Sequence, residues 1–267
     1  MDLEKIIEIT IKRVTFERGV PVSQELFDQV YRKDKTEFIP SESLCDFYKT
    51  KVKTWLDRIQ ERGPLSILEL GCGRGTLFEN TALSEMEERL LLITGIDYSF
   101  WAIEKAKSRW RTMRPDFPNL NVQFFMKNVL DGPQLEKSYH LVVDSHLYHC
   151  LLDKNDQRKA LKNVRASLKK DGIFVLETMV SHEGMRFQDP FFYEKKNSLL
   201  LKEDKWGALI AFRSIPSPLE VERSILEAGF SIEYFTIPPL LRVIPDEKRR
   251  ESLDTDPQCL RIICRKT

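Results

Sequence analysis

The chain has 267 residues, of which 42% are hydrophobic, so it is long enough to bury a sizeable core. Its 42 Lys and Arg residues balance 41 Asp and Glu residues, so no global charge favours nucleic acid or an anionic membrane as a partner. No stretch approaches the roughly 18 apolar residues of a membrane span, and the charged N-terminus lacks the apolar region of a signal peptide. We therefore expect a soluble protein with a small-molecule partner.

The five cysteines are odd in number and include no CxxC pair. Three of them lie in apolar runs that read as core strands or their ends, which favours reduced, buried thiols. Because disulfides form in oxidising compartments, this cysteine usage predicts a cytoplasmic location.

Residues 1–62 are predicted to form a helical lid or cap that precedes the main domain. Its expected packing residues are aromatic or apolar: Phe27, Val30, Tyr31, Phe47, Tyr48, Trp55 and Leu56. Tyr31 is also a candidate for contact with the substrate.

Residues 63–267 are predicted to form a Rossmann-like α/β domain. Short apolar runs alternate here with longer helical patterns, which is typical of parallel βαβ units buried on both faces. We expect a doubly wound, mostly parallel seven-stranded sheet with helices on both faces and a late antiparallel pair. The predicted strands are 66–70, 89–97, 122–127, 140–144, 172–177, 230–237 and 259–265.

Two helices of this domain are legible in detail. Ala160, Leu161, Val164 and Leu168 form an apolar stripe at helical spacing, which the KKDG turn at 169–172 is expected to end. Farther on, Ser217 is predicted to be an N-cap with Pro218 at the first helical position and Glu220 closing a capping box, and Gly229 is the expected terminator. Between these helices, residues 178–216 are rich in aromatics without clear periodicity and are predicted to be a lid insertion.

The segment LELGCGRGT at 68–76 places glycines at alternate positions after the first predicted strand. Glycines between a strand and a helix let backbone amides approach a ligand that a Cβ would keep away. A dinucleotide fingerprint would need glycine at position 76, where this chain has Thr76. Glu69 beside the loop would repel a pyrophosphate but suits a ligand with positive charge.

Asp97 ends the second predicted strand, 24 residues after Gly73. A carboxylate at this place accepts hydrogen bonds from ribose hydroxyls. A glycine loop, a cationic amino-acid group and a ribose together describe S-adenosylmethionine. The alternative is structural, with the glycines serving only a tight turn and Asp97 capping a helix.

The segments LELGCGRG, GIDYS and LVVDSHLYHCL, followed by a helix and LKKDGIFVLE, resemble the class I S-adenosylmethionine-dependent methyltransferases over about residues 64–180. The resemblance implies S-adenosylmethionine as the cofactor. It places Glu69, Gly71 and Gly73 along the methionine part, Asp97 at the ribose and Tyr98 at the adenine side. The full set predicted to bind the cofactor is Glu69, Gly71, Cys72, Gly73, Asp97, Tyr98, Asn128, Val129 and Asp144.

Two positions depart from the family's pattern. Asn128 stands where an acidic residue commonly follows the third strand, although an amide can both donate and accept at the adenine edge. His140 replaces a frequent acid at the start of the fourth strand.

Methyl transfer from a sulfonium is an in-line displacement, so the protein contributes mainly alignment of the acceptor, and a base helps only if the acceptor has a proton to lose. His149 and His146 follow the fourth strand at the rim where the methyl group would emerge, and they are the candidate general bases. A metal site that also uses Asp144, Glu177 and His182 matches no strong ligand spacing, so no metal is predicted. Aromatic candidates for the substrate pocket are Tyr31, Tyr148, Phe191 and Tyr193, which are equally suited to pack a lid.

The expected function is methyl transfer to a small-molecule acceptor. Methylation of RNA or protein is the alternative within the same chemistry, and a basic helix at 102–114 with two tryptophans on or beside it is its only support. Outside this chemistry, a non-catalytic module that binds S-adenosylmethionine and a nicotinamide dehydrogenase stay open. Composition does not indicate the oligomeric state.

Overall fold

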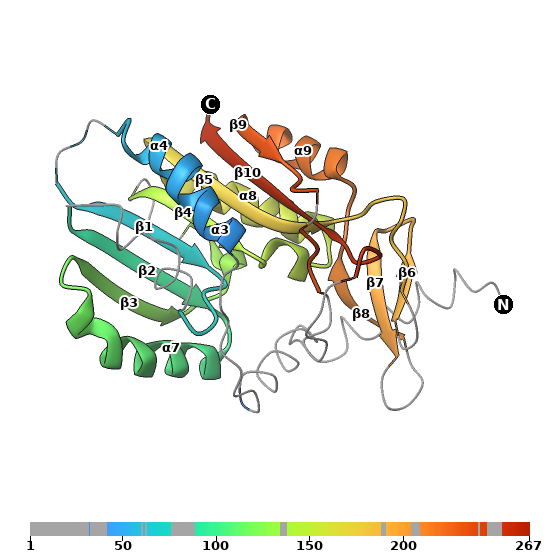
Figure 1. Ribbon diagram of the computed structural model, residues 1–267, viewed down its shortest axis with the longest axis horizontal. Coiled ribbons are helices and arrows are strands. Elements are labelled where there is room, and N and C mark those ends of the chain that lie inside the picture. The colour runs from blue at the N-terminus through green and yellow to red at the C-terminus, as the bar shows by residue number, and fades with distance from the viewer. Residues whose placement is uncertain are drawn as a thin grey trace.

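A computed structural model describes residue 32 and residues 42–59, 61, 63–75, 89–133, 138–187, 191–203, 209–239, 241–244 and 253–267. Tyr31, Thr76 and most of the predicted segment 1–62 lie outside the described residues. The described part of the chain forms one seven-stranded sheet flanked by helices and a separate three-stranded sheet (Figure 1).

The seven-stranded sheet has the order β3-β2-β1-β4-β5-β10-β9. Its strands are β1 (Leu65–Leu70), β2 (Leu91–Asp97), β3 (Leu120–Met126), β4 (Tyr139–Ser145), β5 (Leu168–Val180), β9 (Phe230–Thr236) and β10 (Gln258–Lys266). Neighbouring strands from β3 to β5 pair in parallel, and β10 runs antiparallel to both β5 and β9. The predicted fold class and all seven predicted strands are confirmed.

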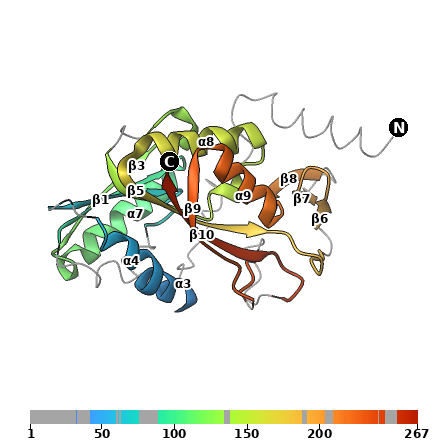
Figure 2. The same cartoon turned by 90° about the horizontal axis from the view of Figure 1, so that it is seen from above.

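Helices cover both faces of this sheet (Figure 2). The α-helices are α3 (Glu42–Phe47), α4 (Lys53–Leu56), α7 (Phe100–Met113), α8 (Lys154–Ser167) and α9 (Pro218–Glu227), with a π-helix η1 (Tyr48–Val52) and 3₁₀ turns η2 (Arg114–Asp116), η3 (Val129–Asp131) and η4 (Tyr148–Cys150). The helices α3 to α4 bury Phe47, Tyr48 and Leu56 in a core cluster with β1, β2 and β5. On the other face, α8 and α9 share a second cluster with β4 and β5. The described part of the predicted N-terminal cap is therefore helical and packs on the sheet, and its role as a lid stays a prediction.

The capping box predicted for α9 is present. The amide of Glu220 donates to the Ser217 hydroxyl at 3.3 Å, and the Glu220 carboxylate accepts from the Ser217 amide at 2.9 Å. These reciprocal bonds satisfy two amides that a helix start leaves without intrahelical partners. Gly229 follows the helix with φ 82°, as its role of terminator requires.

The predicted end of α8 is wrong. The helix stops at Ser167, and Leu168 already belongs to β5, where it pairs with Tyr139. The next pair joins Leu141 to Ile173, so β5 advances from Leu168 to Ile173 while β4 advances only from Tyr139 to Leu141. The KKDG segment is thus an irregularity within β5, because pairing with β4 continues on both sides of it.

The segment 178–216 contains a structure that the sequence did not predict. It forms β6 (Phe191–Glu194), β7 (Leu199–Glu203) and β8 (Leu209–Ser214), which pair antiparallel in the order β6-β7-β8. This small sheet lies beyond the carboxyl ends of β1, β2 and β3 (Figure 1). It therefore stands on the side of the main sheet where ligands of doubly wound folds bind.

His140 has a structural role at the amino ends of the strands. Its Nδ1 accepts the Ser66 amide at 2.9 Å, and its Nε2 lies 2.8 Å from the Glu61 carboxylate. The histidine on β4 therefore accepts a hydrogen bond from β1 through Nδ1 and can donate one to Glu61 through Nε2–H. An acid at position 140 would have no ring N–H to donate to Glu61.

Within the described part of the chain, no helix is both long enough and apolar enough to cross a membrane.

Candidate functional site

The turn that leaves β1 is built from glycines in the left-handed region. Gly71, Gly73 and Gly75 have φ values of 62°, 51° and 67°, which side chains with a Cβ rarely adopt. At Gly75 a Cβ would also approach the Phe124 ring to 2.6 Å. The Cys72 amide donates to the Ile96 carbonyl at 3.0 Å and ties the turn to β2. The three glycines are therefore required by backbone conformation, and at Gly75 also by the close approach of the Phe124 ring.

Asp97 joins the end of β2 to this loop. One carboxylate oxygen accepts the Gly73 amide at 3.0 Å and the other accepts the Ser99 amide at 2.8 Å. Ser99 is the N-cap of α7, so Asp97 also helps to fix the start of that helix, as the structural alternative for this residue predicted. Each carboxylate oxygen has a second lone pair, and a ribose contact remains chemically compatible with these bonds.

Glu69 lies in β1 directly before the loop and is 3% exposed. Its Oε2 is buried and, among the described residues, has no hydrogen-bond partner. Burial and the neighbouring Asp97 carboxylate raise the pKa of Glu69 well above its ordinary value. Two buried carboxyl groups, one with an unsatisfied oxygen, fit a ligand that brings a cation and N–H donors, such as the ammonium of a methionine group.

The predicted adenine side is formed by the ends of β2 and β3. Asn128 is the N-cap of η3, and its side-chain oxygen accepts the Leu130 amide at 2.9 Å. Val129 is buried and its carbonyl accepts from Asn163 at 2.8 Å. Tyr98 is half-buried directly after Asp97. These residues share the carboxyl edge with the glycine loop, and their contacts with a cofactor stay predictions.

The turn after β4 is organised by Asp144. Its Oδ1 accepts the amides of Leu147 and Tyr148 at 2.8 and 3.2 Å. Burial raises the pKa of Asp144 to about 7, although these two bonds oppose the shift. Tyr148 is 1% exposed and packs in the core cluster beneath α9, where burial raises its pKa to about 12. This position favours the packing role for Tyr148 over contact with the substrate.

The two candidate histidines come together but differ in environment. Their ring centroids lie 5.5 Å apart with an interplanar angle of 65°. His149 is 2% exposed, and its Nδ1 lies 3.3 Å from the Thr178 hydroxyl and 3.4 Å from the Met179 amide, which donates to it. Burial lowers the pKa of His149 well below its ordinary value, and electrostatic interactions with His146 and Arg213 act in the same direction. His149 is therefore an enclosed imidazole whose burial favours the neutral form.

His146 is the more exposed of the pair, with 27% of its side chain accessible. Its backbone has φ 73°, an uncommon value for a residue with a Cβ and one that is frequent at functional sites. Its Nε2 lies 2.9 Å from the Glu177 carboxylate, which Arg261 also binds. Burial would raise the pKa of Glu177, but His146 and Arg261 outweigh burial and lower it to about 2.

Sequence reasoning missed Arg261 and underestimated Glu177. Both are less than 5% exposed, and they are 84 residues apart in sequence. They meet because β10 inserts beside β5, where Arg261 pairs with Glu177 in the antiparallel register. The signal in the sequence was Arg261 within the apolar run CLRIIC, since a charge in a core strand requires a buried partner.

The metal site weighed from the sequence does not assemble. His182 Nε2 lies 2.8 Å from the Asp256 carbonyl. Across the residues whose positions are described, no group of three or more His, Cys, Asp or Glu side chains has an arrangement that could hold a metal ion.

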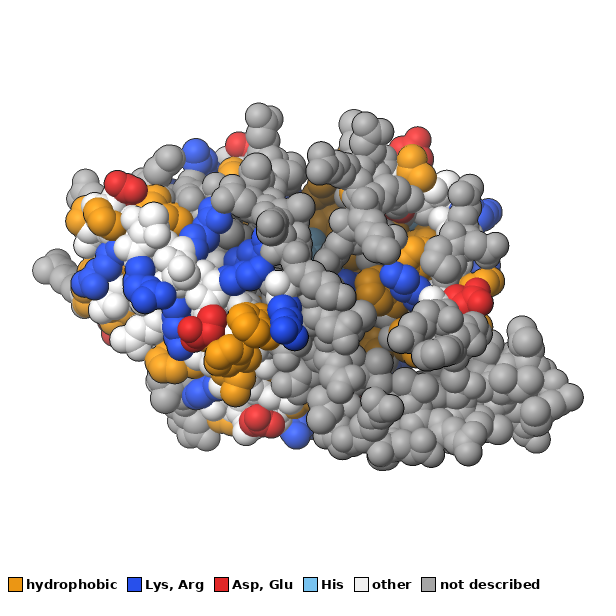
Figure 3. Space-filling view, turned by 90° about the horizontal axis from the view of Figure 1, so that it is seen from below, with side chains coloured by type: hydrophobic (Ala, Val, Ile, Leu, Met, Phe, Trp, Pro, Cys, Tyr) orange, Lys and Arg blue, Asp and Glu red, His pale blue; other side chains and the backbone are white. Residues whose placement is uncertain are grey.

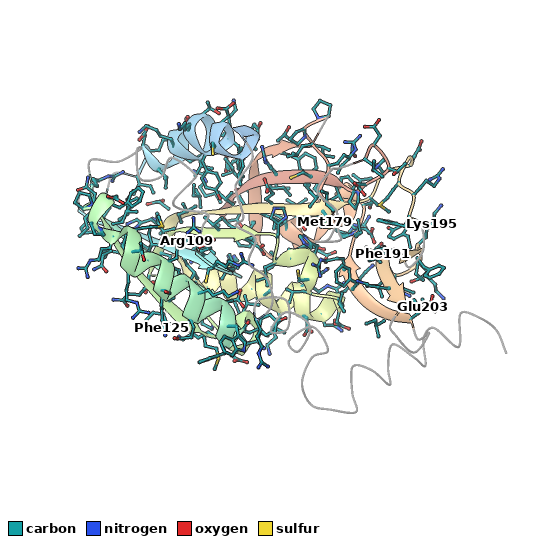
Figure 4. The ribbon with its side chains drawn as sticks, turned by 60° about the horizontal axis from the view of Figure 1, so that its bottom comes forward. Arg109, Phe125, Met179, Phe191, Lys195 and Glu203 are labelled. Atoms are coloured by element: carbon teal, nitrogen blue, oxygen red, sulfur yellow. The ribbon has the colours of Figure 1, made fainter. Side chains whose placement is uncertain are left out.

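The small sheet supplies the aromatic candidates. Phe191 is buried in the same core cluster as Met179, the penultimate residue of β5, and both are seen on the same side of the molecule in Figure 4. Tyr193 donates its hydroxyl to the Ile215 carbonyl at 2.8 Å. Arg213 is 5% exposed, with its guanidinium 4.0 Å from the Phe212 ring centroid. The sheet thus brings apolar surface and a buried cation to the end of β5, and the substrate contacts of Phe191 and Tyr193 stay predictions.

Comparison with known proteins identifies the family. Residues 62–211, more than half of the chain, match the model of a family described as a methyltransferase domain. The chain belongs to this methyltransferase family. The predicted class I S-adenosylmethionine-dependent methyltransferase is therefore confirmed, including its enzymatic class and its cofactor.

Three relatives illustrate the similarity. The chain is 26% identical over 157 residues to a methyltransferase of Geobacillus sp. (strain WCH70), covering 57% of this chain and 58% of that protein. It is 27% identical over 148 residues to a malonyl-[acyl-carrier protein] O-methyltransferase of Bacillus cereus, covering 55% and 49%. The match thus spans about half the length of these relatives. A SAM-dependent methyltransferase structure from Methanosarcina mazei has the same fold, with TM-score 0.62 and 18% identity over 79% of this chain and 96% of that one.

Proposed function

We propose that this chain transfers a methyl group from S-adenosylmethionine to a small-molecule acceptor by in-line displacement. The proposal rests on one observation above all: a loop of three left-handed glycines beside a buried Glu69 whose Oε2 has no partner among the described residues. Such a loop admits backbone contact with a ligand, and such a carboxyl group selects a cationic one.

The residues that hold the cofactor follow from their positions. Glu69, Gly71 and Gly73 line the methionine end, and Asp97 takes the ribose hydroxyls. Tyr98, Asn128 and Val129 bound the adenine, with Cys72 and Asp144 lining the same edge. When bound, the cofactor supplies an electrophilic methyl group on a sulfonium. The chain contributes alignment of the acceptor with that methyl and exclusion of water.

A proton acceptor is needed when the methyl acceptor carries an O–H or N–H group. His146 suits this role better than His149, because it is partly exposed and Glu177 orients its ring. His149 is enclosed, with Nδ1 directed at Thr178 and Met179. His146 therefore takes the proton of the methyl acceptor, and His149 holds the turn against β5.

A small acceptor is favoured by the surroundings of the site. The small sheet β6–β8 brings the apolar side chains of Phe191 and Phe212 to the carboxyl end of β5. The Bacillus cereus relative is named for O-methylation of a malonyl group, which is small although it is bound to a carrier protein. The balanced charge of the chain gives no support to an RNA substrate.

The test uses the purified chain with S-adenosylmethionine labelled in the methyl group and cell extracts fractionated by size. The expected result is label in the low-mass fraction. Label only in RNA or protein would overturn the small-molecule acceptor, and cofactor binding without any labelled product would indicate a binding module. Calorimetry should give heat with S-adenosylhomocysteine and none with NADH; the reverse would indicate a dehydrogenase.

The roles of the two histidines are separable once an acceptor is known. His146→Gln should lower kcat by about 10²–10⁴-fold with a small change in KM, and the loss should be smaller at high pH, where the acceptor ionises unaided. His149→Gln should change the thermal midpoint more than the pH profile of kcat. A larger kcat loss in His149→Gln with native stability would exchange the two assignments.

A further inference from the structure

A buried ion pair stands behind the proposed base, and cofactor binding does not explain it. Lys and Arg side chains lie over much of the face seen in Figure 3, where water solvates their charge, but Arg261 on β10 is 2% exposed. Its Nε donates to Oε2 of the buried Glu177 at 2.5 Å. Such a pair often adds no stability over well-packed apolar side chains, because both charges lose their water. A role in the site therefore has to be considered.

The order of the strands brings three side chains into one line of contacts. In the antiparallel register of β5 and β10, Arg261 lies directly opposite Glu177. On the other side of β5, Ser145 at the end of β4 pairs with Glu177, so His146 is the first residue beyond β4. The His146 amide donates to the Glu177 carbonyl at 3.1 Å, and its Nε2 lies 2.9 Å from Glu177 Oε1. The two oxygens of one carboxylate thus join the arginine to the histidine.

The surroundings of the pair keep Glu177 ionised. The Arg261 guanidinium carbon lies 5.3 Å from the ring centroid of Phe47 on α3, which is itself buried. Little water is present to screen the attraction between the two charges. Burial raises the pKa of Glu177, but His146 and Arg261 outweigh burial and lower it to about 2. Glu177 is therefore a carboxylate that accepts hydrogen bonds and has no proton to donate.

An ionised Glu177 decides which nitrogen of His146 carries the ring proton. Because a carboxylate only accepts, a neutral imidazole that bonds to it through Nε2 must have its proton on Nε2, and its lone pair is on Nδ1. A protonated Glu177 would reverse this arrangement, since its O–H would donate to Nε2 and leave the ring proton on Nδ1.

We propose that Arg261 is a positioning residue that acts through Glu177 to hold His146 in the Nε2–H tautomer, with Nδ1 as the atom that takes the proton of the methyl acceptor. The role rests on the proposed function, which uses His146 as the base. The acceptor's O–H or N–H proton moves to Nδ1 while the acceptor's lone pair takes the methyl group, leaving the electrons of the broken C–S bond on sulfur. The imidazolium then carries the positive charge lost by the sulfonium, and its Nε2–H stays on the Glu177 carboxylate.

Other ionisable groups also face this line of contacts. Asp144 on β4 interacts electrostatically with His146, but its Oδ1 accepts two backbone amides. His149 lies next to His146, and Arg213 on β8 interacts with His149. Cys259 on β10 is close to both members of the ion pair, and burial raises the pKa of its thiol well above the ordinary value. Of these described groups, the guanidinium of the buried pair is the cation that contacts the carboxylate beside the proposed base.

Nitrogen NMR of the imidazole ring tests the tautomer directly. The full chain is labelled with ¹⁵N-histidine, the missing signals in His146→Gln assign the ring, and spectra are recorded at a pH where the ring is neutral. The wild type is expected to have Nε2 protonated and Nδ1 unprotonated. A wild type with the proton on Nδ1 would overturn the proposal, and this measurement needs no variant of Arg261, no cofactor and no methyl acceptor.

Variants at position 261 test the source of the tautomer. Arg261→Met removes the cation and keeps much of the side chain's length, so Glu177 should bind a proton and the Nε2–H tautomer should be lost. Arg261→Lys returns a cation and should restore it. The matched control is Arg265→Met on the same strand, which breaks the exposed pair with Glu233 and should leave the tautomer unchanged. An unchanged tautomer in a folded Arg261→Met, or its loss in Arg265→Met, would overturn the role of Arg261.

Methyl transfer gives a second reading once an acceptor is known. Arg261→Met should lower kcat about tenfold or more near neutral pH with a small change in KM, and the acid limb of its pH profile should move to higher pH. Arg261→Lys should recover most of the loss. A loss that is equal at every pH would indicate a purely structural pair and contradict the proposal.

The two readings separate the proposed positioning role from the proposed function. The expected tautomer without any labelled product would contradict methyl transfer and support the action of Arg261 on His146. Labelled product from a protein whose His146 has its proton on Nδ1 would contradict the positioning role alone.

Discussion

Glu69 on β1 and Glu177 on β5 occupy similar places and have opposite electrostatics. Both are glutamates in the carboxyl half of a parallel strand, and both are less than 5% exposed. His146 and Arg261 overcome the burial of Glu177 and lower its pKa to about 2. Burial and Asp97 raise the pKa of Glu69 instead. Glu177 has a counter-charge within the protein, the Arg261 guanidinium, whereas Glu69 has a buried Oε2 to which no described residue donates a hydrogen bond, a place that suits a cation brought by a ligand.

The largest effect is expected on protein stability, when Glu177 on β5 is replaced. Glu177→Ala should lower the free energy of unfolding by about 3–5 kcal/mol, because it leaves the buried Arg261 guanidinium without its carboxylate. Denaturant unfolding measures the loss. The matched control is Glu233→Ala, which breaks a pair with the half-exposed Arg265 at 3.2 Å and should cost no more than about 1 kcal/mol. Equal losses in both variants would contradict the contrast between a buried pair and a surface pair.

A smaller effect is expected on the glycine-loop side. Asp97→Ala should weaken S-adenosylmethionine binding by about 1–3 kcal/mol, since it removes charge-assisted bonds to the ribose. Because the two oxygens of Asp97 also accept the Gly73 and Ser99 amides, the conservative Asp97→Asn removes the charge and one of these two backbone bonds. The amide keeps one acceptor for the backbone but lacks the charge. Calorimetry that finds unchanged affinity in Asp97→Ala would remove Asp97 from the cofactor site.

The glycine loop and Asp97 were predictable because their signals are local. Each glycine of GCGRG has a positive φ, which glycine adopts without steric cost, so the residue type itself indicates this conformation. Asp97 was placed by its position at the end of an apolar run, and parallel strands bring their carboxyl ends to one edge. The seven strands were legible for the same reason, since a buried parallel strand is a short continuous apolar run.

The β5 side was not predictable, because its contacts depend on strand order. Nothing in the sequence places β10 between β5 and β9, and only that order brings Arg261 to Glu177. The small sheet was missed for a related reason. Its strands LLLKE and LIAFRS are short and do not alternate cleanly, and their pairing with each other, not their own pattern, stabilises them.

Glu69→Gln sharpens the comparison of the two glutamates. The substitution should weaken S-adenosylmethionine binding by about 1–2 kcal/mol, because the amide retains an acceptor but attracts a cation less. The stability of the unliganded protein should stay the same or rise, since a carboxyl group beside Asp97 is removed. Glu177→Gln, as the counterpart, should lower stability. A Glu69→Gln protein that loses stability would mean that Glu69 already has its counter-charge within the chain.

The smallest expected effect is the release of a proton from Glu69 when S-adenosylmethionine binds. The raised pKa of Glu69 means that its carboxyl group retains a proton at pH values where an ordinary glutamate is ionised. A cation bound beside it favours the carboxylate, so binding of S-adenosylmethionine should release that proton and the affinity should increase as pH rises toward the raised pKa. The slope cannot exceed about tenfold per pH unit for one proton.

Calorimetry in buffers of different ionisation enthalpy counts this proton directly. The wild type should release between zero and about one proton, with the fraction falling as the pH passes the raised pKa, and Glu69→Gln should release none. Asp144, whose pKa is raised to about 7, is the other buried acid at this edge, so Asp144→Asn is the necessary control and should leave the release unchanged. If the release disappears in Asp144→Asn and persists in Glu69→Gln, the cation lies beside β4, and the contrast between Glu69 and Glu177 has a different origin.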